Sequence, residues 1–353
     1  RGNNMNPLVE CVPNFSEGRD KDKIKMITNV VEKDPNVTLL DVDMGFDFNR
    51  TVVTMVGNPE SVLNTVIECT KIASQIIDMS KHTGEHARMG AVDVVPFIPI
   101  RDITMDDCIE LSQRYAEAIS NELDIGVFLY AKSARIADRI KLPDIRRGEY
   151  EGLPDKLSKA EWKPDYGPAV FNSKLGVTAT GARQFLIAFN INLNTNDKLK
   201  ANSIASKIRT SGHLIKDKEG NKIIDSEGKP KRKPGLFNSL QAAGWMYNDD
   251  IAQVSMNFLD YSITGLHTVT EEIKKQATLL DIEATSSELV GLVPLEAMLD
   301  AGRYYSKSDD LTEEEYVNIA IEGLMLNKLN KFDSKSNIIE WAISGGDKYE
   351  WRI

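Results

Sequence analysis

The chain has 353 residues, of which 41% are hydrophobic and 27% are charged, and its formal net charge is −10. This composition is typical of a globular protein with one large or two ordinary domains and a sizeable core. The acidic balance argues against a general nucleic-acid-binding protein, because contacts with phosphate need a basic face, although a few clustered cations suffice for a small anionic ligand.

The three cysteines, Cys11, Cys69 and Cys108, are widely spaced and form no Cys-x-x-Cys pair of the kind that binds metals. An odd and scattered set favours reduced thiols in a cytoplasmic protein. No apolar run approaches the roughly 20 residues that span a bilayer. Residues 1–4 precede Met5, and we expect them to be an artificial extension rather than part of a signal peptide.

Predicted strands and helices alternate through the first half of the chain. In order, they are a strand at 8–15, a helix at 20–33, strands at 37–43 and 51–57, a helix at 58–80, a strand at 91–100, a helix at 104–120, a strand at 125–131 and a basic helix or turn region to about 147. Apolar residues at helical spacing, such as Ile24 and Ile27, indicate the helices, and Asn58-Pro59-Glu60 is a typical helix start. The order β-α-β-β-α-β predicts a split βαβ arrangement with extra elements.

The second half repeats this order of elements. Residues 186–208 predict a strand, an Asn-rich turn and an amphipathic helix, and residues 289–299 predict a strand, a proline-containing exit and a helix. Between them, residues 250–262 alternate between polar and apolar side chains, which indicates a strand, and a helix begins near His267. We therefore predict an α+β protein whose two similar halves each carry helices on one face of a sheet.

Two connecting segments show little periodicity. Residues 160–184 are rich in Gly, Pro and aromatic residues. Loops of this length inside a compact protein are usually functional or disordered, and the aromatic residues argue against disorder. Residues 216–235 are charged and rich in turn formers. They predict an exposed hairpin, with a gate over a cleft as the alternative.

The segment HTGEHARMG (82–90) contains two of the chain's four histidines, His82 and His86, in the H-x-x-E-H pattern of one class of zinc peptidase. Zinc binding by this pattern needs both side chains on one helix face. The glycines, and the end of the apolar periodicity near Met79, instead indicate a turn between a helix and a strand. A histidine in such a turn suits proton transfer, because its unperturbed pKa of about 6.5 lies near neutrality. Polar loop residues without a catalytic role are the remaining alternative.

Other polar residues lie at predicted strand ends in the same half. Asp43 ends one strand, Arg50 lies at the start of the next, and Asn14 and Glu17 follow the first strand. Clefts beyond strand ends are common ligand sites, so we expect a binding site there. For each residue taken singly, a turn, a cap or a surface ion pair is the alternative.

Stretches of sequence between about residues 8 and 302 resemble, in order, the formiminotransferase domain of the formimidoyltransferase-cyclodeaminase family. They are LVECVPNFSEGRD, LLDVDMGFDFNRTVVTMVGNP, IDMSKHTGEHARMGAVDVVPFIPIRDITMDDC, EWKPDYGP, GARQFLIAFNINL, AQVSMNFLDYSITGLHTV and LVGLVPLEAMLDA. The resemblance implies two ferredoxin-like, βαββαβ-type subdomains, a ligand cleft between them that binds folate, and a homodimer. The implied boundaries are 5–183 for the N-terminal subdomain, which holds the catalytic histidine, 184–335 for the C-terminal subdomain and 336–353 for a C-terminal tail.

The same resemblance implies a stand-alone transferase. The animal bifunctional enzyme continues with a cyclodeaminase domain, for which no room remains after Ile353, and residues 216–235 resemble an insertion relative to that enzyme.

Particular site residues are also implied. The family's G-E-H-x-R-M-G motif places the catalytic histidine on His86, and its acidic partner corresponds to Asp43. Both substrates carry carboxylates, so cations should line the cleft, and for Arg50 and Arg183 a structural salt bridge is the alternative. The implied substrate-binding and folate-binding residues are Gly167, Pro168, Ala169, Val170, Phe171, Asn172, Ser173, Lys174, Leu175, Gly176, Arg50, Arg88 and Arg183.

The implied reaction transfers the formimino group of N-formimino-L-glutamate to N5 of tetrahydrofolate, the co-substrate, in histidine degradation, without a metal. We expect His86 to move the proton from N5 to the glutamate nitrogen and Asp43 to orient it or stabilise its charged form. His267 is either a second cleft residue or a helix-start residue. A formyl donor, a zinc hydrolase and a non-catalytic folate-binding protein are the alternative functions.

Overall fold

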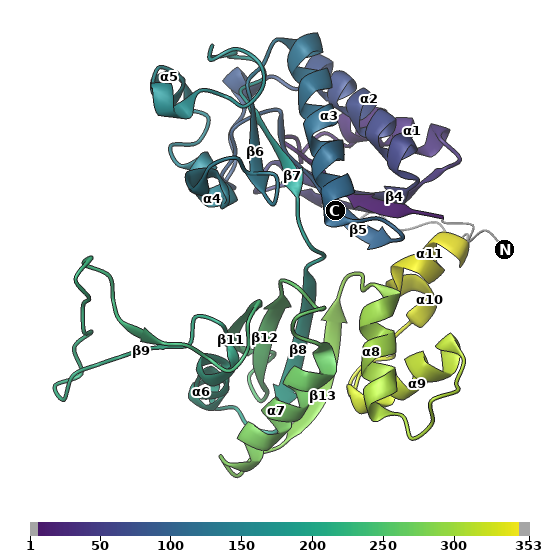
Figure 1. The fold of residues 1–353 in the computed structure, drawn as a ribbon, viewed down its shortest axis with the longest axis vertical. Helices are drawn as coiled ribbons and strands as arrows, with labels where there is room; N and C mark the ends of the chain where they lie inside the picture. The colour runs from purple at the N-terminus through teal and green to yellow at the C-terminus, as the bar shows by residue number, and fades with distance from the viewer. Residues whose placement is uncertain (1–5, 346–353) are drawn as a thin grey trace. The chain divides into compact units, whose positions relative to one another are not determined.

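The computed structural model describes residues 6–345, and the chain divides into two compact units, the first ending at Gln184 and the second beginning at Phe185. Each unit has its own sheet and its own helices (Figure 1). The chain is therefore a mixed α/β protein with two sheet-rich parts. The predicted N-terminal extension and residues 346–353 of the predicted tail lie outside the described residues.

The first unit is built on a seven-stranded sheet in which β1 and β2 both lie between β4 and β5. The strand order is β3-β4-β1/β2-β5-β7-β6, and only the pairs β5–β7 and β7–β6 are parallel. The strands are β1 (Leu8–Cys11), β2 (Asn14–Phe15), β3 (Val37–Gly45), β4 (Arg50–Gly57), β5 (Val92–Arg101), β6 (Val127–Ala131) and β7 (Thr178–Ala182). The helices are α1 (Lys21–Lys33), α2 (Pro59–Ile76), α3 (Met105–Leu123), α4 (Leu142–Arg146) and α5 (Leu153–Leu157), with 3₁₀ turns η1 (Met79–Lys81), η2 (Ala137–Arg139) and η3 (Ala160–Trp162).

The predicted helix start at Asn58 is confirmed. The Asn58 side chain accepts hydrogen bonds from the backbone N–H groups of Glu60 and Ser61, and Pro59 occupies the first helical position. The helix ends at Ile76 rather than near residue 80, because η1 replaces its last turn. Strand β7 lies inside the segment predicted as a loop at 160–184. Its sequence TATGA is buried at every position, so it lacks the alternation that marks a half-exposed strand.

Alternating side chains of the first sheet build two separate cores. On one face, Val95 and Phe97 of β5 pack in a cluster with apolar residues of α1, α2 and α3, including Tyr115. On the other face, Val94 of β5 packs with Ile145 of α4 and with residues of α5. The prediction of helices on one face is therefore confirmed for the three long helices and wrong for α4 and α5, whose apolar side chains need the opposite face for burial.

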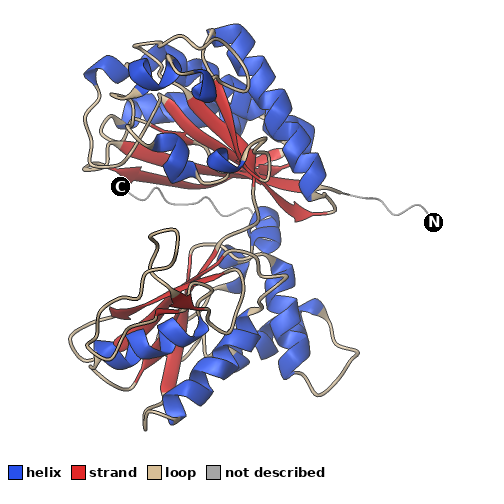
Figure 2. Cartoon of the chain, turned by 60° about the vertical axis from the view of Figure 1, so that its left-hand side comes forward, coloured by secondary structure: helices blue, strands red, loops and turns tan. Residues whose placement is uncertain are grey.

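The second unit carries a four-stranded antiparallel sheet with the order β11-β12-β8-β13. The strands are β8 (Ile187–Leu193), β11 (Leu240–Met246), β12 (Ala252–Phe258) and β13 (Ala284–Val290). The helices are α6 (Lys198–Ile208), α7 (Leu266–Thr278), α8 (Leu295–Tyr305), α9 (Glu313–Gly323), α10 (Ser334–Asn337) and α11 (Ile339–Gly345). Figure 2 shows the sheets and their helices from a second side.

The predicted repeat of element order is confirmed. The series β8-α6-β11-β12-α7-β13 corresponds to β1/β2-α1-β3-β4-α2-β5, and in both units the second hairpin strand lies beside the first strand of the series. Strand β11 was not expected from the sequence, and β13 begins five residues before the predicted position 289, at Ala284. The alternation at 250–262 is borne out, because Ala252, Val254, Met256 and Phe258 are all buried.

Residues 215–231 form an exposed arm between β9 (His213–Leu214) and β10 (Arg232–Lys233), which pair with each other (Figure 1). This confirms the predicted exposed hairpin. The arm makes two turns, in which Asp217 and Asp225 each accept backbone hydrogen bonds from residues two and four positions later. Gly220 and Gly228 complete these turns with φ of +86° and +78°.

The approach of Gly90 to the segment before β7 provides a test of the first unit's packing. A Cβ at Gly90 would lie 2.1 Å from the carbonyl oxygen of Val177, a backbone atom that cannot move aside. Gly90→Ala should therefore lower the free energy of unfolding by about 2–3 kcal/mol. Gly220→Ala in the arm meets no atom within 4 Å, and its left-handed backbone should cost only about 1 kcal/mol. Urea unfolding of both variants gives the comparison, and equal losses would contradict the packing described.

Candidate active site

Residues 82–90 form an irregular turn between η1 and β5, as the glycines predicted. Backbone hydrogen bonds fix both ends: Met79 donates to the carbonyl of Lys174 (2.8 Å) and Ala91 to that of Leu175 (2.9 Å). In the middle, Glu85 donates to the carbonyl of Asp47 (3.1 Å). The turn that carries the two histidines is therefore held by two other chain segments, and the histidines do not share a helix face.

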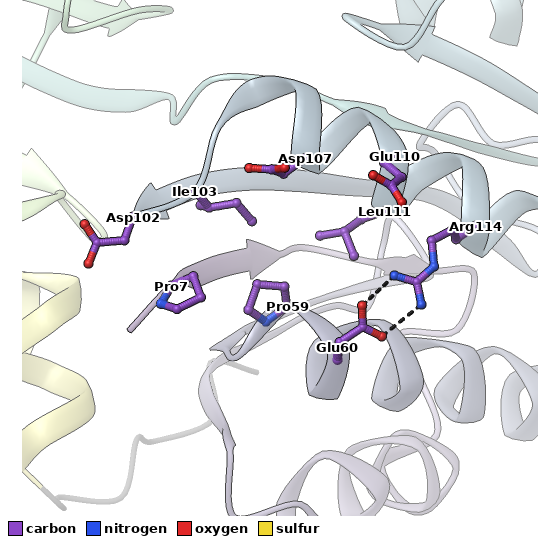
Figure 3. A pocket seen from close by; sticks show the side chains of 9 residues that line it. All are labelled: Pro7, Pro59, Glu60, Asp102, Ile103, Asp107, Glu110, Leu111 and Arg114. Atoms are coloured by element: carbon purple, nitrogen blue, oxygen red, sulfur yellow. Dashed lines mark hydrogen bonds and ion pairs between the residues drawn. The ribbon is translucent and has the colours of Figure 1, made fainter. Parts of the chain in front are cut away.

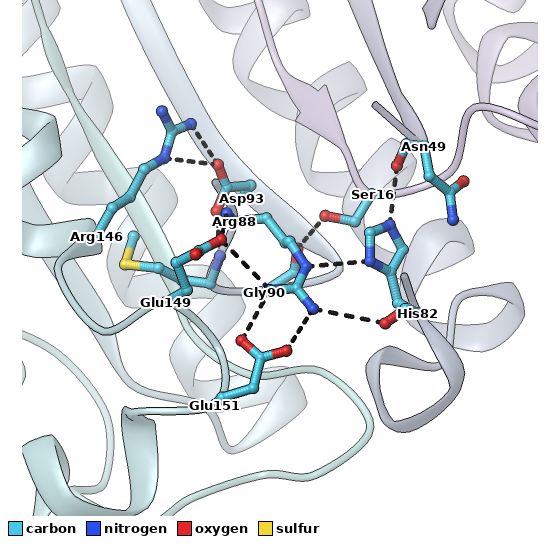
Figure 4. A network of polar contacts seen from close by, with 10 residues as sticks. Ser16, Asn49, His82, Arg88, Gly90, Asp93, Arg146, Glu149 and Glu151 are labelled. Carbon is cyan, nitrogen blue, oxygen red and sulfur yellow. Dashed lines mark hydrogen bonds and ion pairs between the residues drawn. The ribbon is translucent and has the colours of Figure 1, made fainter. Parts of the chain in front are cut away.

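His82 has both ring nitrogens occupied (Figure 4). Nδ1 faces the Nε–H of Arg88 at 3.1 Å, and Nε2 lies 2.8 Å from the carbonyl oxygen of Asn49. An arginine only donates, so Nδ1 must accept and Nε2 must carry the proton that Asn49 receives. Burial lowers the pKa of His82, which keeps the ring in this neutral form. The contacts give His82 a structural role in linking the turn to the connection between β3 and β4.

Arg88 is the centre of the polar network in Figure 4. Its guanidinium binds Glu151 through both terminal nitrogens, at 2.9 and 2.7 Å, and also lies 3.5 Å from Glu149. These hydrogen bonds, first of all those to Glu151, raise the pKa of Arg88. The side chain thus holds the segment after α4 against the histidine turn. The predicted contact of Arg88 with substrate stays a prediction, and the structure gives its guanidinium internal partners.

His86 has a different environment. Its Nε2 contacts Nη1 of Arg50, while its buried Nδ1 has no hydrogen-bond partner among the described residues. The ring of Phe48 meets it edge-on, with centroids 6.1 Å apart. Burial lowers the pKa of His86, and the positive charges of Arg50 and Arg146 lower it further. At neutral pH, the ring is therefore an unprotonated base.

Strands β3 and β4 bring Asp43 to the same site. Gly45 pairs with Arg50 and Asp43 pairs with Val52, so Asp43 and Arg50 lie on one face of the sheet as diagonal neighbours. Burial lowers the pKa of Arg50, Arg146 lowers it further, and the carboxylates of Asp93 and Asp43 oppose this change. Asp43 therefore acts on Arg50, the direct partner of His86.

A buried ion pair that was not expected from the sequence supports this site from β5. Asp93 lies at an irregularity in the pairing of β5 with β2 and is 1% exposed. One carboxylate oxygen accepts a hydrogen bond from the backbone N–H of Met89 at 2.6 Å, and the other accepts one from Nε–H of Arg146 at 3.0 Å. The sequence signal for this ion pair was Asp93 itself, a single acid inside the apolar run AVDVVPFIPI, because a buried charge needs a partner.

The predicted folate-binding segment, residues 167–176, reaches the histidine turn with its C-terminal end. The Asn172 side chain accepts the backbone N–H groups of Lys174 and Leu175, and Tyr150 donates to the carbonyl of Ser173 at 2.6 Å. Ala169, Val170, Ser173 and Lys174 are exposed. The structure thus brings residues 172–176 close to the turn and leaves much of the segment accessible.

Arg183 belongs to a second polar group on the first sheet. Burial raises the pKa of Glu10 on β1 to about 7, and the charge of Arg183 opposes this shift. Burial also raises the pKa of Tyr130 on β6, which Arg183 opposes through its charge and a hydrogen bond. Arg183 is therefore grouped with Glu10 and Tyr130, whereas Arg50 is the arginine in contact with His86.

The second unit has a polar network on one face of its sheet. Gln253 on β12 donates to Asn192 on β8 at 2.9 Å and to Glu288 on β13 at 3.0 Å.

His267 lies in the first turn of α7, the helix-start position, and its ring stacks on Tyr304 with the ring centroids 4.7 Å apart. Burial lowers the pKa of His267.

A pocket of about 270 Å³ lies elsewhere in the first unit (Figure 3). It is lined by Pro7, Pro59, Glu60, Asp102, Ile103, Asp107, Glu110, Leu111 and Arg114. Asp102 and Ile103 follow β5, whereas the histidine turn precedes it. The ten residues of β5 span roughly 30 Å, so this pocket is separate from the histidines.

Within residues 6–345, no group of three or more His, Cys, Asp and Glu side chains is arranged to hold a metal ion. In the H-x-x-E-H pattern, both ring nitrogens of His82 make hydrogen bonds within the protein, and Nε2 of His86 contacts an arginine.

Two family models match almost the whole chain. The formiminotransferase domain, N-terminal subdomain, matches residues 8–183, and the formiminotransferase domain matches residues 188–344.

Curated relatives agree with these matches. The chain is 44% identical over 343 residues to formimidoyltransferase-cyclodeaminase of Sus scrofa, covering 96% of this chain and 60% of that protein. It is 40% identical to glutamate formimidoyltransferase of Streptococcus pyogenes serotype M1 and 37% identical to that of Thermoplasma acidophilum, covering 87% of this chain in both cases and 95% and 94% of those proteins. The chain therefore spans about 60% of the length of the bifunctional relatives it matches and nearly all of the shorter ones.

The fold and the site define a class, namely mixed α/β proteins of two related units in which a half-buried, neutral histidine contacts an arginine. Within that class, the chain belongs to the formiminotransferase family.

The role of Arg88 can be tested by stability measurements. Arg88→Met removes the bidentate bond to Glu151 and the donor to Nδ1 of His82, and it should lower the free energy of unfolding by about 1–3 kcal/mol. Glu151→Gln keeps a hydrogen-bond acceptor at an exposed position and should cost less than about 1 kcal/mol. Chemical denaturation measures both, and a harmless Arg88→Met would show that the network does not hold the turn.

Glu10 gives a test of pH dependence. Because burial raises its pKa from 4.5 to about 7, the folded state binds the proton more tightly than the unfolded state between those values. The contribution of Glu10 to the free energy of unfolding is therefore largest below pH 4.5. It decreases by roughly 3 kcal/mol as the pH rises from 4.5 to about 7. Glu10→Gln removes this titration, so the variant should gain stability relative to the parent between pH 5 and pH 8. Parallel stability profiles for the two proteins over that range would disprove the shift.

Proposed function

We propose that the chain is a glutamate formimidoyltransferase, which transfers the formimino group of N-formimino-L-glutamate to N5 of tetrahydrofolate and releases 5-formiminotetrahydrofolate and L-glutamate. The observation that carries this proposal is His86, a half-buried base with a lowered pKa in contact with Arg50. The likeness to curated glutamate formimidoyltransferases over 94–95% of their length supports the substrates.

The chemistry is an exchange of one nitrogen for another at the formimino carbon. N5 attacks this carbon, and the tetrahedral intermediate must lose a proton from N5 and gain one at the glutamate nitrogen. A single base with a pKa near or below neutrality can perform both transfers in sequence, which contributes roughly 10²–10⁴-fold to the rate. We assign this role to His86, because a ring that is neutral before reaction can accept the first proton.

Asp43 acts, in this proposal, through Arg50. The two side chains are diagonal neighbours, and the carboxylate favours the charged form of the guanidinium. Asp43 thereby keeps a cation against Nε2 of His86 while the ring is neutral. Once His86 takes a proton, the same carboxylate lowers the cost of two positive charges at close range.

The co-substrate tetrahydrofolate is proposed to bind residues 167–176, with Arg183 as a further cation. Support comes from the hydrogen bonds that hold residues 172–176 against the histidine turn and from the exposed side chains nearby. Lys174 would meet a carboxylate there. No metal is proposed, and Arg88 is proposed to act in support of the turn.

The remaining parts of the assignment are proposals as well. The strand orders β3-β4-β1-β5 and β11-β12-β8-β13 support two ferredoxin-like subdomains, proposed at 5–183 and 184–335 with a tail from 336. The predicted cleft between them stays a prediction. Within the described range, no helix combines the length and the hydropathy needed to cross a membrane. We propose a cytoplasmic homodimer that acts in histidine degradation, and light scattering of the purified protein would measure its oligomeric state.

Loss of the proposed base gives the most direct test. His86→Ala should lower turnover by roughly 10²–10⁴-fold while leaving the unfolding transition and folate binding nearly unchanged. His213→Ala removes an exposed histidine of β9 and serves as the matched control, with the parent's activity expected. Steady-state rates, folate titrations and circular dichroism provide the readouts. Near-full activity of His86→Ala would refute the proposed role.

The donor distinguishes the remaining candidates. N-formylglutamate differs from the formimino donor by one oxygen in place of nitrogen, and rates with both donors decide between the two transferases. Folate binding without transfer from either donor would indicate a non-catalytic binding protein. Stoichiometric zinc in the purified protein, together with loss of activity on chelation, would support the zinc hydrolase.

A further inference from the structure

Arg50 and His86 are brought together by a local arrangement of β3, β4 and the histidine turn. The turn between the two strands ends at Asn49, which has a φ of +49°, and Arg50 follows as the first residue of β4. The guanidinium carbon lies 5.9 Å from the centroid of the Phe48 ring, which in turn meets His86 edge-on. The aromatic ring therefore confines both partners of the contact.

The contact determines where the proton of neutral His86 lies. Arg50 can only donate, so Nε2 of His86 must accept, and the single ring proton must be on Nδ1. Nδ1 is buried and makes no hydrogen bond of normal geometry in the described part of the chain, although the backbone of Ala87 lies close enough to favour a proton on the ring. Burial of an unsatisfied N–H group is costly, so the partner at Nε2 is what selects this tautomer.

The charged groups that act on His86 or on its partner Arg50 come from four elements. Arg50 lies on β4, Asp43 on β3, Asp93 on β5 and Arg146 on α4. Asp93 is already bound by Arg146 and by the backbone N–H of Met89. Arg50, in contrast, donates to a neutral ring nitrogen. A carboxylate can accept two parallel hydrogen bonds from a guanidinium and adds an opposite charge, so an incoming carboxylate offers Arg50 a better partner than the single neutral nitrogen of His86.

The proposed donor brings such a carboxylate to the right place. In N-formimino-L-glutamate, the α-carboxylate is attached to the carbon that carries the reacting nitrogen. A guanidinium that binds this carboxylate therefore lies beside the bond to be broken. Glutamate leaves with the same carboxylate, so the contact lasts through the reaction.

We propose that Arg50 is a substrate-responsive positioning residue: it occupies Nε2 of His86 before the donor binds, and the α-carboxylate of the donor draws it away and frees Nε2. This rests on the proposed function, because it assigns the donor's carboxylate to Arg50. The N5–carbon bond then forms, and the proton of N5 passes to Nε2. The bond from carbon to the glutamate nitrogen breaks as Nε2 returns that proton to the leaving nitrogen, so His86 ends as it began.

The resting state is tested without catalysis. Full-length protein with ¹⁵N-labelled histidine, assigned with His86→Asn, should show Nδ1 of His86 protonated and Nε2 unprotonated at pH 7.5. Formiminoglutamate alone, without folate, should shift the Nε2 resonance. In Arg50→Gln, the pH midpoint of His86 should rise and the donor should cause no such shift. Arg19→Gln, which removes an exposed arginine stacked on Phe46, should behave as the parent. A proton on Nε2 of His86 in the parent protein would overturn the proposal.

Kinetics then test the carboxylate. Arg50→Gln should lower kcat/KM for formiminoglutamate by roughly 10²-fold and move the acid limb of its pH profile upward, and Arg50→Lys should restore part of the loss. With N-formimino-4-aminobutyrate, which lacks only the α-carboxylate, Arg50→Gln should react at least as fast as the parent, because in the parent no α-carboxylate draws Arg50 away from Nε2. Should Arg50→Gln fail to fold, Arg50→Lys and the comparison of the two donors in the parent still give the answer.

The two proposals fail differently. A parent protein that transfers no formimino group from either donor contradicts the proposed function, whatever the histidine resonances show. A parent protein that transfers the group, but whose Arg50→Gln variant loses as much activity with N-formimino-4-aminobutyrate as with formiminoglutamate, contradicts the role of Arg50 alone.

Discussion

The site depends on the compensation of one buried charge, the guanidinium of Arg88. A charged group that is only 8% exposed needs a full set of partners, and Arg88 finds them in Glu151, Glu149 and His82. Glu149 and Glu151 belong to the segment after α4, whereas His82 belongs to the turn. Satisfying one side chain thus ties the segment after α4 to residues 82–90 and fixes the ring of His82. Without these bonds, the turn has few regular hydrogen bonds of its own, and the position of His86 would be poorly defined.

Two histidines of similar sequence context acquire different chemistry from their partners. His82 is saturated at both nitrogens by groups of the protein itself, so its proton is committed to the carbonyl of Asn49. His86 has a cation at one nitrogen and, among residues 6–345, no hydrogen-bond partner at the other. Burial lowers the pKa of both rings. The difference therefore lies in the number of partners: both nitrogens of His82 are occupied, whereas only one nitrogen of His86 has a partner among the described residues.

Local pattern predicted much of the fold and the identity of the turn. Apolar periodicity located α1, α2 and α3, and the glycines between the histidines correctly indicated a turn. Strand β7 escaped detection because every residue of TATGA is buried in a parallel pairing, which leaves no alternation to read. The partners of Arg88 were equally hidden, since Glu151 is 63 residues away and an exposed glutamate looks like any other surface charge. Contacts of this range follow from the packing of α4 and α5 on the second face of the sheet, and short helices carry little periodic signal.

The arm at 215–231 has a consequence for how the second unit tolerates change. Its two ends are joined by the β9–β10 pair, so the strands that follow, β11 and β12, keep their register whatever lies beyond that pair. The turns at Asp217 and Asp225 follow the same pattern, Ile-x-Asp-x-Glu-Gly, which begins at Ile215 and recurs eight residues later at Ile223. Such a segment can lengthen or shorten by whole units without disturbing the sheet. It is therefore a natural place for lineages to diverge in size and for a label or a fused peptide to be attached.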